Sequence, residues 1–314
     1  MIVFGTADSG PAQYLSEVIH SIRTPYLCFS SVISAKVFTK NNIKAIAYKS
    51  DRIPKEKVSQ IIVGSPLSNM SIDFQLLKWG KQNKIKTIMI IEHWTNFKER
   101  IAALDESNFP LEFWVNDVSC KQKLIELGIN QNSICSVGNP TLEKLEQSPK
   151  MKQSKNNAIL FVSEHMSDPH FQLKQKYGFD EHCVLEAILK YKSPQTPLFI
   201  KLHPEEKKDK YKTLCQAHGL ELHQEATKEA MGKYEIIIGM NSFLLIELAL
   251  MGSKVYTYRP NQTERFIGEE LYLSYNLQES ELASLLQEKV YFKSTISSVS
   301  FLGSKHNILK RLSN

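Results

Sequence analysis

The chain has 314 residues, which is longer than one hydrophobic core usually grows, so we expect two domains. Apolar residues make up 42% and charged residues 23%, which excludes a wholly disordered or fibrous chain. The net charge of +6 favours an anionic partner such as a nucleotide diphosphate, an acidic glycan or a lipid surface. The basic residues are not gathered into the stripe typical of a nucleic-acid reader, so we expect no nucleic-acid partner.

The five cysteines are scattered and include no CxxC pair, which indicates buried thiols in a reducing compartment. The N-terminus lacks the basic start of a signal peptide, and no stretch approaches the roughly 18 apolar residues of a membrane-spanning helix. We therefore expect a cytoplasmic protein. The basic closing segment 306–314 leaves a peripheral contact with the inner membrane open, although an ordinary solvated face explains it as well.

Short β-branched runs alternate with helical patterns through the first half of the chain. This alternation predicts a parallel, doubly wound α/β domain over residues 1–147. The expected strands are 2–4, 26–29, 44–48, 60–64, 86–92, 111–115 and 133–137.

A polar stretch over 148–156 has no apolar periodicity and is interpreted as a linker. The strand and helix pattern then restarts, which predicts a second Rossmann-like domain over 157–314 that includes the C-terminal helix. Two such sheets are expected to face each other across a cleft, because open α/β sheets place ligands at the carboxyl ends of their strands. The expected strands are 157–163, 198–202, 220–223, 235–239 and 254–258, followed by helices at 279–289 and 306–314.

The strand 198–202 delivers His203 and Pro204 at its carboxyl end. Proline restricts the backbone and removes a donor, so the imidazole is held by a stiff turn. An imidazole in that position can donate to a phosphate oxygen or protonate a leaving nucleotide. The alternative is a histidine at a strand end that is hydrogen-bonded to a neighbour.

The strand 235–239 ends in a polar turn, and an apolar helix begins near Ser242, which suits an N-cap. The free N–H groups and the positive end of the helix dipole form a ready site for a nucleotide phosphate. Glu247 in the same helix can accept a ribose hydroxyl. The alternative is a capped core helix whose glutamate pairs with a lysine.

Together, His203-Pro204 and the strand-turn-helix around Asn241 and Ser242 resemble the paired HP and serine motifs of bacterial sialyltransferases and related capsular or lipopolysaccharide polysaccharide transferases of the GT-B fold. The resemblance implies two Rossmann-like domains, with the CMP phosphate and its leaving group bound by the C-terminal one. The loop after the strand 157–163 often faces the donor in GT-B folds. The donor-binding residues implied in this way are His203, Pro204, Asn241, Ser242, Phe243, Glu247, Ser163 and Glu164.

The segment SVGNPTLEKL at 136–145 is similar to the end of the first domain in GT-B enzymes and sugar-nucleotide epimerases, where a strand ends in Gly-Asn-Pro. Gly138 permits a tight turn and Pro140 prepares the following helix. We expect this segment to act as a hinge and a cleft wall.

In the first domain, the apolar run 87–91 delivers Glu92 to a strand end. Glycosyl transfer with inversion needs a base for the acceptor hydroxyl, and a carboxylate there can serve. The resembling sialyltransferases take their base from a D/E-D/E-G motif, which this sequence lacks near any expected strand end. Asp8, in a glycine-bearing turn that is not GxGxxG, therefore competes with Glu92 as the catalytic base. The expected acceptor-binding residues are Gly5, Ser9, His93 and Asn96.

A polar cluster follows the first strand of the second domain and contains Glu164, His165, Asp168 and His170. These residue types can ligate zinc, but the cluster has no partner group elsewhere, so we expect no metal site. The sequence also contains no GxSxG, P-loop or HExxH motif, which leaves serine-hydrolase, P-loop and zincin functions without support.

The resulting hypothesis is a metal-independent, inverting GT-B glycosyltransferase without a cofactor. It would move a sugar, such as a sialic-acid-like nonulosonic acid, from a nucleotide-sugar donor to a cell-surface glycan acceptor, with a CMP-sugar favoured over a UDP-sugar. His203 and Ser242 would stabilise the departing phosphate, and Glu92 or Asp8 would take the acceptor proton. Two alternatives stay open, a UDP-sugar enzyme such as a hydrolysing 2-epimerase and a non-catalytic glycan- or nucleotide-binding module.

Overall fold

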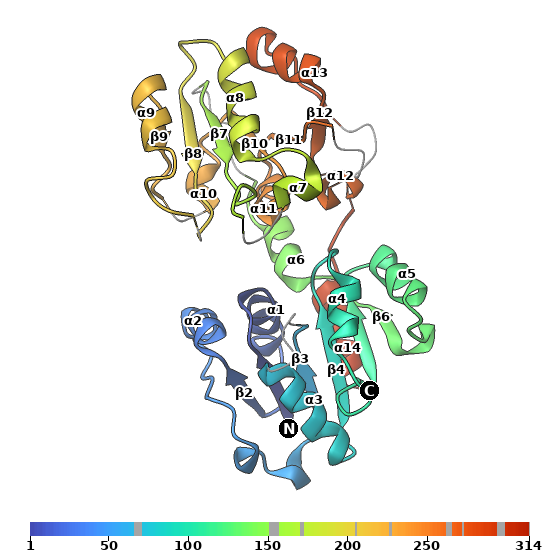
Figure 1. Cartoon of the computed structure of the whole chain (residues 1–314). Coiled ribbons are helices and arrows are strands. Elements are labelled where there is room, and N and C mark those ends of the chain that lie inside the picture. Colours follow the sequence, from blue (N-terminus) through green and yellow to red (C-terminus); the bar gives the residue numbers. More distant parts are fainter. Residues whose placement is uncertain are drawn as a thin grey trace. The chain divides into compact units, whose positions relative to one another are not determined.

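The computed structural model describes residues 1–313 except 66–70, 151–156, 170–172, 205, 226–227, 262–265, 272 and 294–298. The chain divides into two compact units, unit 1 with Met1–Lys144 and Phe301–Asn314, and unit 2 with Leu145–Ser300. Each unit contains a parallel sheet of six strands with helices on its faces (Figure 1). The prediction of two α/β units is therefore confirmed.

The sheet of unit 1 has the strand order β2-β1-β3-β4-β5-β6. The order reverses between β1 and β3, and such a reversal marks the point at which open α/β sheets bind ligands. The four central strands are mostly buried on both faces, as expected for a parallel sheet covered by helices. The strands of this sheet are β1 (Ile2–Thr6), β2 (Tyr26–Ser30), β3 (Gln60–Val63), β4 (Lys86–Ile91), β5 (Glu112–Val115) and β6 (Ile134–Ser136).

Some helices of unit 1 begin at polar residues that accept from free backbone N–H groups. Ser31 caps one helix through the N–H groups of Ile33 and Ser34, and Asp117 caps another through that of Cys120. The helices are α1 (Ser9–Ile19), α2 (Val32–Lys40), α3 (Ile72–Gln82), α4 (Phe97–Ala102), α5 (Val118–Glu126) and α6 (Pro140–Gln147), with α14 (Ser304–Leu312) from the end of the chain. The boundary between the units falls within α6.

The sheet of unit 2 has the order β12-β11-β10-β7-β8-β9. Counted from β7 this is the 3-2-1-4-5-6 order of the Rossmann fold, with its reversal between β7 and β10. The strands are β7 (Ile159–Val162), β8 (Leu198–Lys201), β9 (Glu221–Leu222), β10 (Ile236–Gly239), β11 (Val255–Tyr258) and β12 (Tyr275–Leu277). Apolar residues such as Ile159, Phe161 and Ile238 pack with Val184 and Ile188 into one core cluster of this unit.

The described helices of unit 2 alternate with its strands along the chain. They are α7 (Leu173–Tyr177), α8 (Glu181–Tyr191), α9 (Lys212–His218), α10 (Lys228–Met231), α11 (Phe243–Leu250), α12 (Ile267–Glu270) and α13 (Glu279–Ala283), which continues into a π-helical turn over Ser284–Glu288. Asp180 caps α8 by accepting from the N–H of Cys183 at 2.9 Å.

The structure differs from the sequence-based prediction in two segments of unit 1. The segment 44–48 forms no strand, because Ile46 alone bridges to β2, exchanging hydrogen bonds with Cys28 and Ser30. The C-terminal helix belongs to unit 1, which corrects the expected domain 157–314. Ile308 of this helix is buried in the core cluster of unit 1, and the backbone N–H of Lys305 donates to Glu143 at 2.7 Å.

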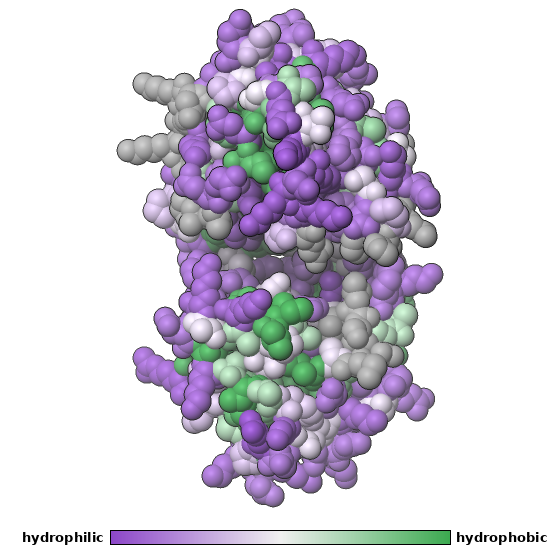
Figure 2. Space-filling model, turned by 60° about the vertical axis from the view of Figure 1, so that its left-hand side comes forward, coloured by the Kyte–Doolittle hydropathy of each residue, from purple (hydrophilic) through white to green (hydrophobic). Residues whose placement is uncertain are grey.

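Unit 2 contains one strand that the sequence did not predict, since β12 is short and only partly apolar. Most of the expected linker, residues 151–156, lies outside the described residues. Within the described part of the chain, no helix combines the length and the apolar character needed to cross a membrane. Hydrophilic side chains cover most of the face shown in Figure 2, with hydrophobic ones gathered in smaller patches.

Candidate functional site

The reversal point of unit 2 lies between the carboxyl ends of β7 and β10. The strand β7 continues into Ser163, Glu164 and His165, and β10 continues into the turn before α11. Because β7 lies between β10 and β8, it also brings its end close to His203, which follows β8. The two sequence motifs therefore meet at one edge of the sheet, on either side of residues 163–165.

The carboxylate of Glu164 lies at the beginning of α11. The backbone N–H of Asn241 donates to Glu164 Oε1 at 2.6 Å, and the N–H groups of Met240 and Ser242 also favour the charged carboxylate. From the sequence, we expected these N–H groups at the beginning of the helix to donate to a nucleotide phosphate. In this structure a side chain of the protein itself takes that anion position.

Burial raises the pKa of the Glu164 carboxyl from 4.5 to about 7, against the opposing effect of the three backbone N–H groups. The charge of Glu181 raises it further. Loss of hydration therefore outweighs the hydrogen bonds. Glu164 consequently changes between its neutral and charged forms near neutral pH.

Arg259 follows β11 and lies beside the same turn. Its Nη1 is 3.4 Å from the side-chain oxygen of Asn241, and its Nη2 pairs with Glu269 at 2.7 Å. The side chain is 4% exposed, and its Nε has no hydrogen-bond partner. The edge thus contains a buried guanidinium with unused donor capacity, which the sequence reasoning did not identify.

Ser163 is part of a buried polar network. Its hydroxyl donates to Glu206 at 2.8 Å and lies 2.6 Å from the hydroxyl of Tyr211. Lys210 joins this network by pairing with both Glu206 and Glu181. The network ties the segments after β7 and β8 together, so the Ser163 hydroxyl already has partners within unit 2.

His203 is held by the same network. Its backbone N–H donates to Glu206 at 2.6 Å, and its ring packs against that of His165 with centroids 4.5 Å apart. His203 is partly exposed, and Pro204 is exposed. Glu205, the next residue of the motif, lies outside the described residues.

Ser242 is the N-cap of α11, as predicted, and its hydroxyl accepts from the N–H of Leu244 at 3.3 Å. Phe243 begins the helix and is partly buried. Glu247 pairs with Lys228 at 2.6 Å. An ion pair with a lysine was the alternative to ribose binding that the sequence left open for Glu247. Burial raises the pKa of the Glu247 carboxyl.

In unit 1, Glu92 follows β4 and points towards the beginning of α1. A Cβ atom on Gly10 would lie 3.1 Å from Glu92 Oε1, so only glycine leaves full room for this carboxylate. Glu92 Oε1 lies 3.3 Å from His93 Nε2, and Glu92 Oε2 is buried without a hydrogen-bond partner. His93 is about one third exposed, while Glu92 is buried.

Two asparagines hold the backbone behind Glu92. The side chain of Asn116 donates to the Glu92 carbonyl at 2.8 Å, and that of Asn139 donates to Asn116 at 3.3 Å. Asn139 Oδ1 also accepts from the N–H groups of Thr141 and Leu142, which caps α6. The Gly-Asn-Pro segment predicted as a hinge therefore helps to hold Glu92 in place.

The other residues predicted in the first domain are placed differently. Asp8 and Ser9 are exposed where α1 begins, and Asp8 makes no capping hydrogen bond with its side chain. Asn96 is exposed before α4 with a φ of 59°. Gly5 lies inside β1, and a Cβ there would be 2.2 Å from a methyl group of Leu76. The buried position of Gly5 indicates close packing as its role, and its expected contact with an acceptor stays a prediction.

Asp73 is another buried carboxyl of unit 1. The sequence analysis did not identify it as a candidate. Asp73 accepts from the N–H of Ala7 at 2.8 Å, and its Oδ1 has no hydrogen-bond partner. Burial raises its pKa to about 7, opposed by hydrogen bonds from Ala7 and Thr6. Asp73 thus holds the loop that follows β1.

Within the described residues, no three histidine, cysteine, aspartate or glutamate side chains are grouped closely enough to hold a metal ion. His170 of the polar cluster considered above lies outside the described part of the chain.

No family model and no curated protein matches the sequence. Among solved structures, a UDP-GlcNAc 2-epimerase from Methanocaldococcus jannaschii is similar, with a TM-score of 0.67 and 14% identity. The similarity covers 100% of this chain and 99% of that one. The UDP-GlcNAc 2-epimerase from Neisseria meningitidis, solved with bound UDP-GlcNAc, gives a TM-score of 0.66 at 16% identity, with both chains fully covered.

The lipopolysaccharide outer core galactosyltransferase WaaB is also similar, with a TM-score of 0.56 and 12% identity over 100% of this chain and 99% of that one. At these identities the similarities establish the fold. The protein has the two-domain GT-B-like fold, which is shared by UDP-GlcNAc 2-epimerases and GT-B glycosyltransferases.

Proposed function

We propose that the protein is an enzyme that acts on a nucleotide-activated sugar. The observation that carries this proposal is the chemistry at one edge of the sheet in each unit, taken separately. The reversal point of unit 2 presents backbone donors and Arg259 to an anion, and the edge of unit 1 presents the buried carboxylate of Glu92 with an unpartnered oxygen. The first suits a nucleotide phosphate that takes the donors now bonded to Glu164, and the second suits proton transfer.

A UDP-sugar 2-epimerase is the better supported of two specific activities. Two of the solved structures described above carry this name and match the chain over its whole length. Inversion at C2 of a UDP-sugar requires the C2 proton to leave from one face while the bond between C1 and UDP breaks, which leaves a C1=C2 double bond. A proton then adds to the opposite face of C2, and UDP or water adds to C1. The Glu92 carboxylate is the proposed proton carrier, because Gly10 leaves room for its side chain and Asn116 holds its backbone.

A glycosyltransferase is the second candidate, supported by the similarity to the galactosyltransferase and by the HP and serine motifs. In this case Glu92 would take the proton of the acceptor hydroxyl, and His203 would stabilise the departing phosphate. A CMP-activated nonulosonic acid is the donor that the motifs favour. The edge around Glu164 and Asn241 would bind the nucleotide in both activities.

The experiment that tests the proposal is a proton NMR time course of the full chain with UDP-N-acetylglucosamine in D2O. Epimerase activity predicts a new C2 epimer, or free sugar and UDP, with deuterium incorporated at C2 and no acceptor required. A parallel reaction with a CMP-activated nonulosonic acid tests the transferase, which predicts CMP release that depends on an added glycan. Absence of turnover in both reactions, together with absence of nucleotide binding by calorimetry, would overturn the proposal.

A further inference from the structure

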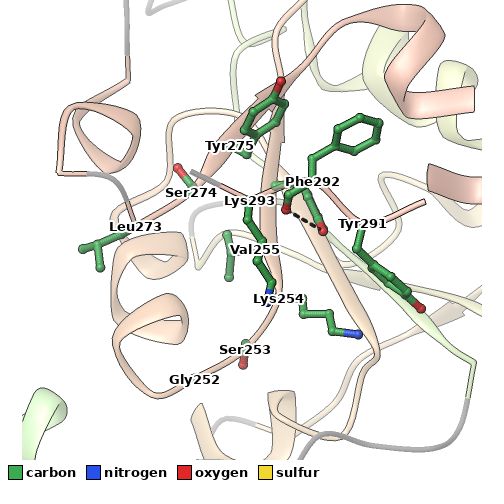
Figure 3. A pocket seen from close by; sticks show the side chains of 11 residues that line it. Gly252, Ser253, Lys254, Val255, Leu273, Ser274, Tyr275, Tyr291, Phe292 and Lys293 are labelled. Atoms are coloured by element: carbon green, nitrogen blue, oxygen red, sulfur yellow. Dashed lines mark hydrogen bonds between the residues drawn. The ribbon is translucent and has the colours of Figure 1, made fainter. Parts of the chain in front are cut away.

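A cavity of about 600 Å³ opens in unit 2 at the amino-terminal ends of β11 and β12. Because the strands are parallel, this is the edge of the sheet opposite to Glu164 and Asn241. Figure 3 shows the side chains that line it. They are Gly252, Ser253, Lys254, Val255 and Tyr256, then Leu273, Ser274 and Tyr275, and finally Tyr291, Phe292 and Lys293.

Two lysines give the cavity a positive charge. In Figure 3 the Lys293 side chain extends towards the beginning of β11, and Lys254 also lines the cavity. Neither lysine forms an ion pair with any of the described residues. The nearby Glu235 is paired with Lys289 at 3.7 Å and accepts from the hydroxyl of Tyr291. The two ammonium groups therefore remain available to an anion.

Aromatic rings form the walls of the cavity and hold one another in place. Tyr275 and Phe292 are stacked with centroids 5.6 Å apart and ring planes at 20°. The Lys254 ammonium lies 3.7 Å from the centre of the Tyr291 ring, a cation–π contact. Tyr256 donates its hydroxyl to the Phe292 carbonyl at 3.2 Å, the hydrogen bond drawn in Figure 3. These contacts preform the cavity, which reduces the entropy lost when a ligand binds.

The lining also contains hydroxyl groups. Ser253 and Ser274 contribute one each, and the Ser274 hydroxyl is buried without a hydrogen-bond partner. The tyrosines add further hydroxyls at the ring edges. Positive charge, hydroxyls and ring faces together match a sugar ring that carries an anionic group, and the volume is within the range of small-molecule sites.

We propose that this cavity is a second ligand site of unit 2 and that it binds an acidic saccharide, a sugar with a phosphate or a carboxylate group. Lys254 and Lys293 bind the anionic group, and the aromatic walls contact the sugar ring. The site is separate from the edge to which the nucleotide is assigned. The proposal therefore stands whether or not the proposed enzymatic function is correct.

The test is isothermal calorimetry on the full chain saturated with UDP, with glucose 1-phosphate, glucuronate and glucose as probes. We expect saturable binding of at least one anionic probe, and binding of glucose at least about tenfold weaker, because charge-assisted hydrogen bonds are lost. The stronger of the two anionic probes identifies phosphate or carboxylate as the recognised group. UDP saturation excludes the nucleotide-binding edge from the measurement.

The decisive variant is Lys254→Gln with Lys293→Gln, which should weaken binding of the anionic probe at least about tenfold. The double variant Lys190→Gln with Lys233→Gln is the matched control, because it removes two exposed charges of unit 2 outside the cavity. Phe292→Leu removes the stacked ring and should weaken binding of the same probe, whereas Phe292→Tyr should retain it. Melting temperatures verify that each variant folds.

Three outcomes would overturn the proposal. One is that neither anionic probe binds saturably, and another is that glucose binds as tightly as both. The third is that the cavity variant, correctly folded, binds the anionic probe as tightly as the control variant.

Discussion

The carboxylate of Glu164, which follows β7, accepts a hydrogen bond of 2.6 Å from the backbone N–H of Asn241 at the beginning of α11. This contact joins the two strands between which the order of the second sheet reverses. It places a negative charge of the protein at the position where a Rossmann-type unit binds an anionic ligand. Two predictions follow from the charge of this residue.

The first concerns the dependence of stability on pH. The pKa of Glu164 is about 7 in the folded protein and 4.5 ordinarily, so the folded state binds this proton more tightly. The resulting stabilisation is complete below pH 4.5 and is lost as the pH rises through 7. Glu164→Gln has no such loss. Its free energy of unfolding, taken relative to that of the wild type, should therefore rise by about 2 kcal/mol between pH 5 and pH 8.5.

Urea unfolding at the two pH values measures the difference between variant and wild type. Glu186→Gln, an exposed substitution on α8, is the control and should show no pH-dependent difference. A constant difference between Glu164→Gln and the wild type from pH 5 to pH 8.5 would show that this carboxyl does not titrate as described.

The second prediction concerns nucleotide affinity. If a phosphate binds at the beginning of α11, the charged Glu164 carboxylate repels the phosphate. It also accepts from the backbone N–H groups that would otherwise donate to the phosphate. Glu164→Gln should therefore bind UDP about tenfold more tightly than the wild type at pH 8, a difference of about 1.4 kcal/mol. Calorimetry measures the two affinities. Unchanged or weaker binding by the variant would place the phosphate elsewhere.

The third prediction concerns Asn139, which links the capping of α6 to the segment after β4. Asn139→Ala should destabilise unit 1 by about 2 kcal/mol, because it leaves buried backbone N–H groups and Asn116 Oδ1 without their partner. Asn130→Ala removes an exposed cap and should cost about 0.5–1 kcal/mol. Equal losses of unfolding free energy for the two variants would argue against a buried network around Asn139.

The fourth prediction concerns Gly5. Gly5→Ala should destabilise the protein by about 1–3 kcal/mol, because the new methyl group would overlap with Leu76. Leu76→Ala should lower that cost when the two substitutions are combined, which a double-mutant cycle in urea detects. Strict additivity of the two effects would contradict the packing role of Gly5.

Much of this fold could be predicted from the sequence, because parallel strands buried on both faces appear as apolar runs with helical patterns between them. The segment 44–48 shows the limit of this rule, since its run of apolar residues after Lys44 is compatible with a strand at the edge of a sheet. The strand β12 is only three residues long and lacks such a signal. Helix α14 was predicted as a helix, but its packing on unit 1 depends on tertiary contacts of Ile308 that no local pattern reveals.

The candidate site was predicted less completely than the fold. The positions of Glu92, His203 and Ser242 after strands could be predicted, because each residue follows an apolar run that stops at polar residues. The contact of Glu164 with the beginning of α11 could not be predicted, because it depends on the order of β7 and β10 in the sheet. Arg259 directly follows an apolar strand, so the rule that identified His203 would also have identified it.

The most direct test of the central claim compares the rate at which wild-type protein and Glu92→Gln consume UDP-N-acetylglucosamine, with melting temperature and UDP affinity measured on the same samples. We predict that the wild type turns the substrate over and that the variant is slower by at least about a hundredfold with melting temperature and UDP affinity unchanged. A folded variant that retains the wild-type rate would contradict the assignment of proton transfer to Glu92.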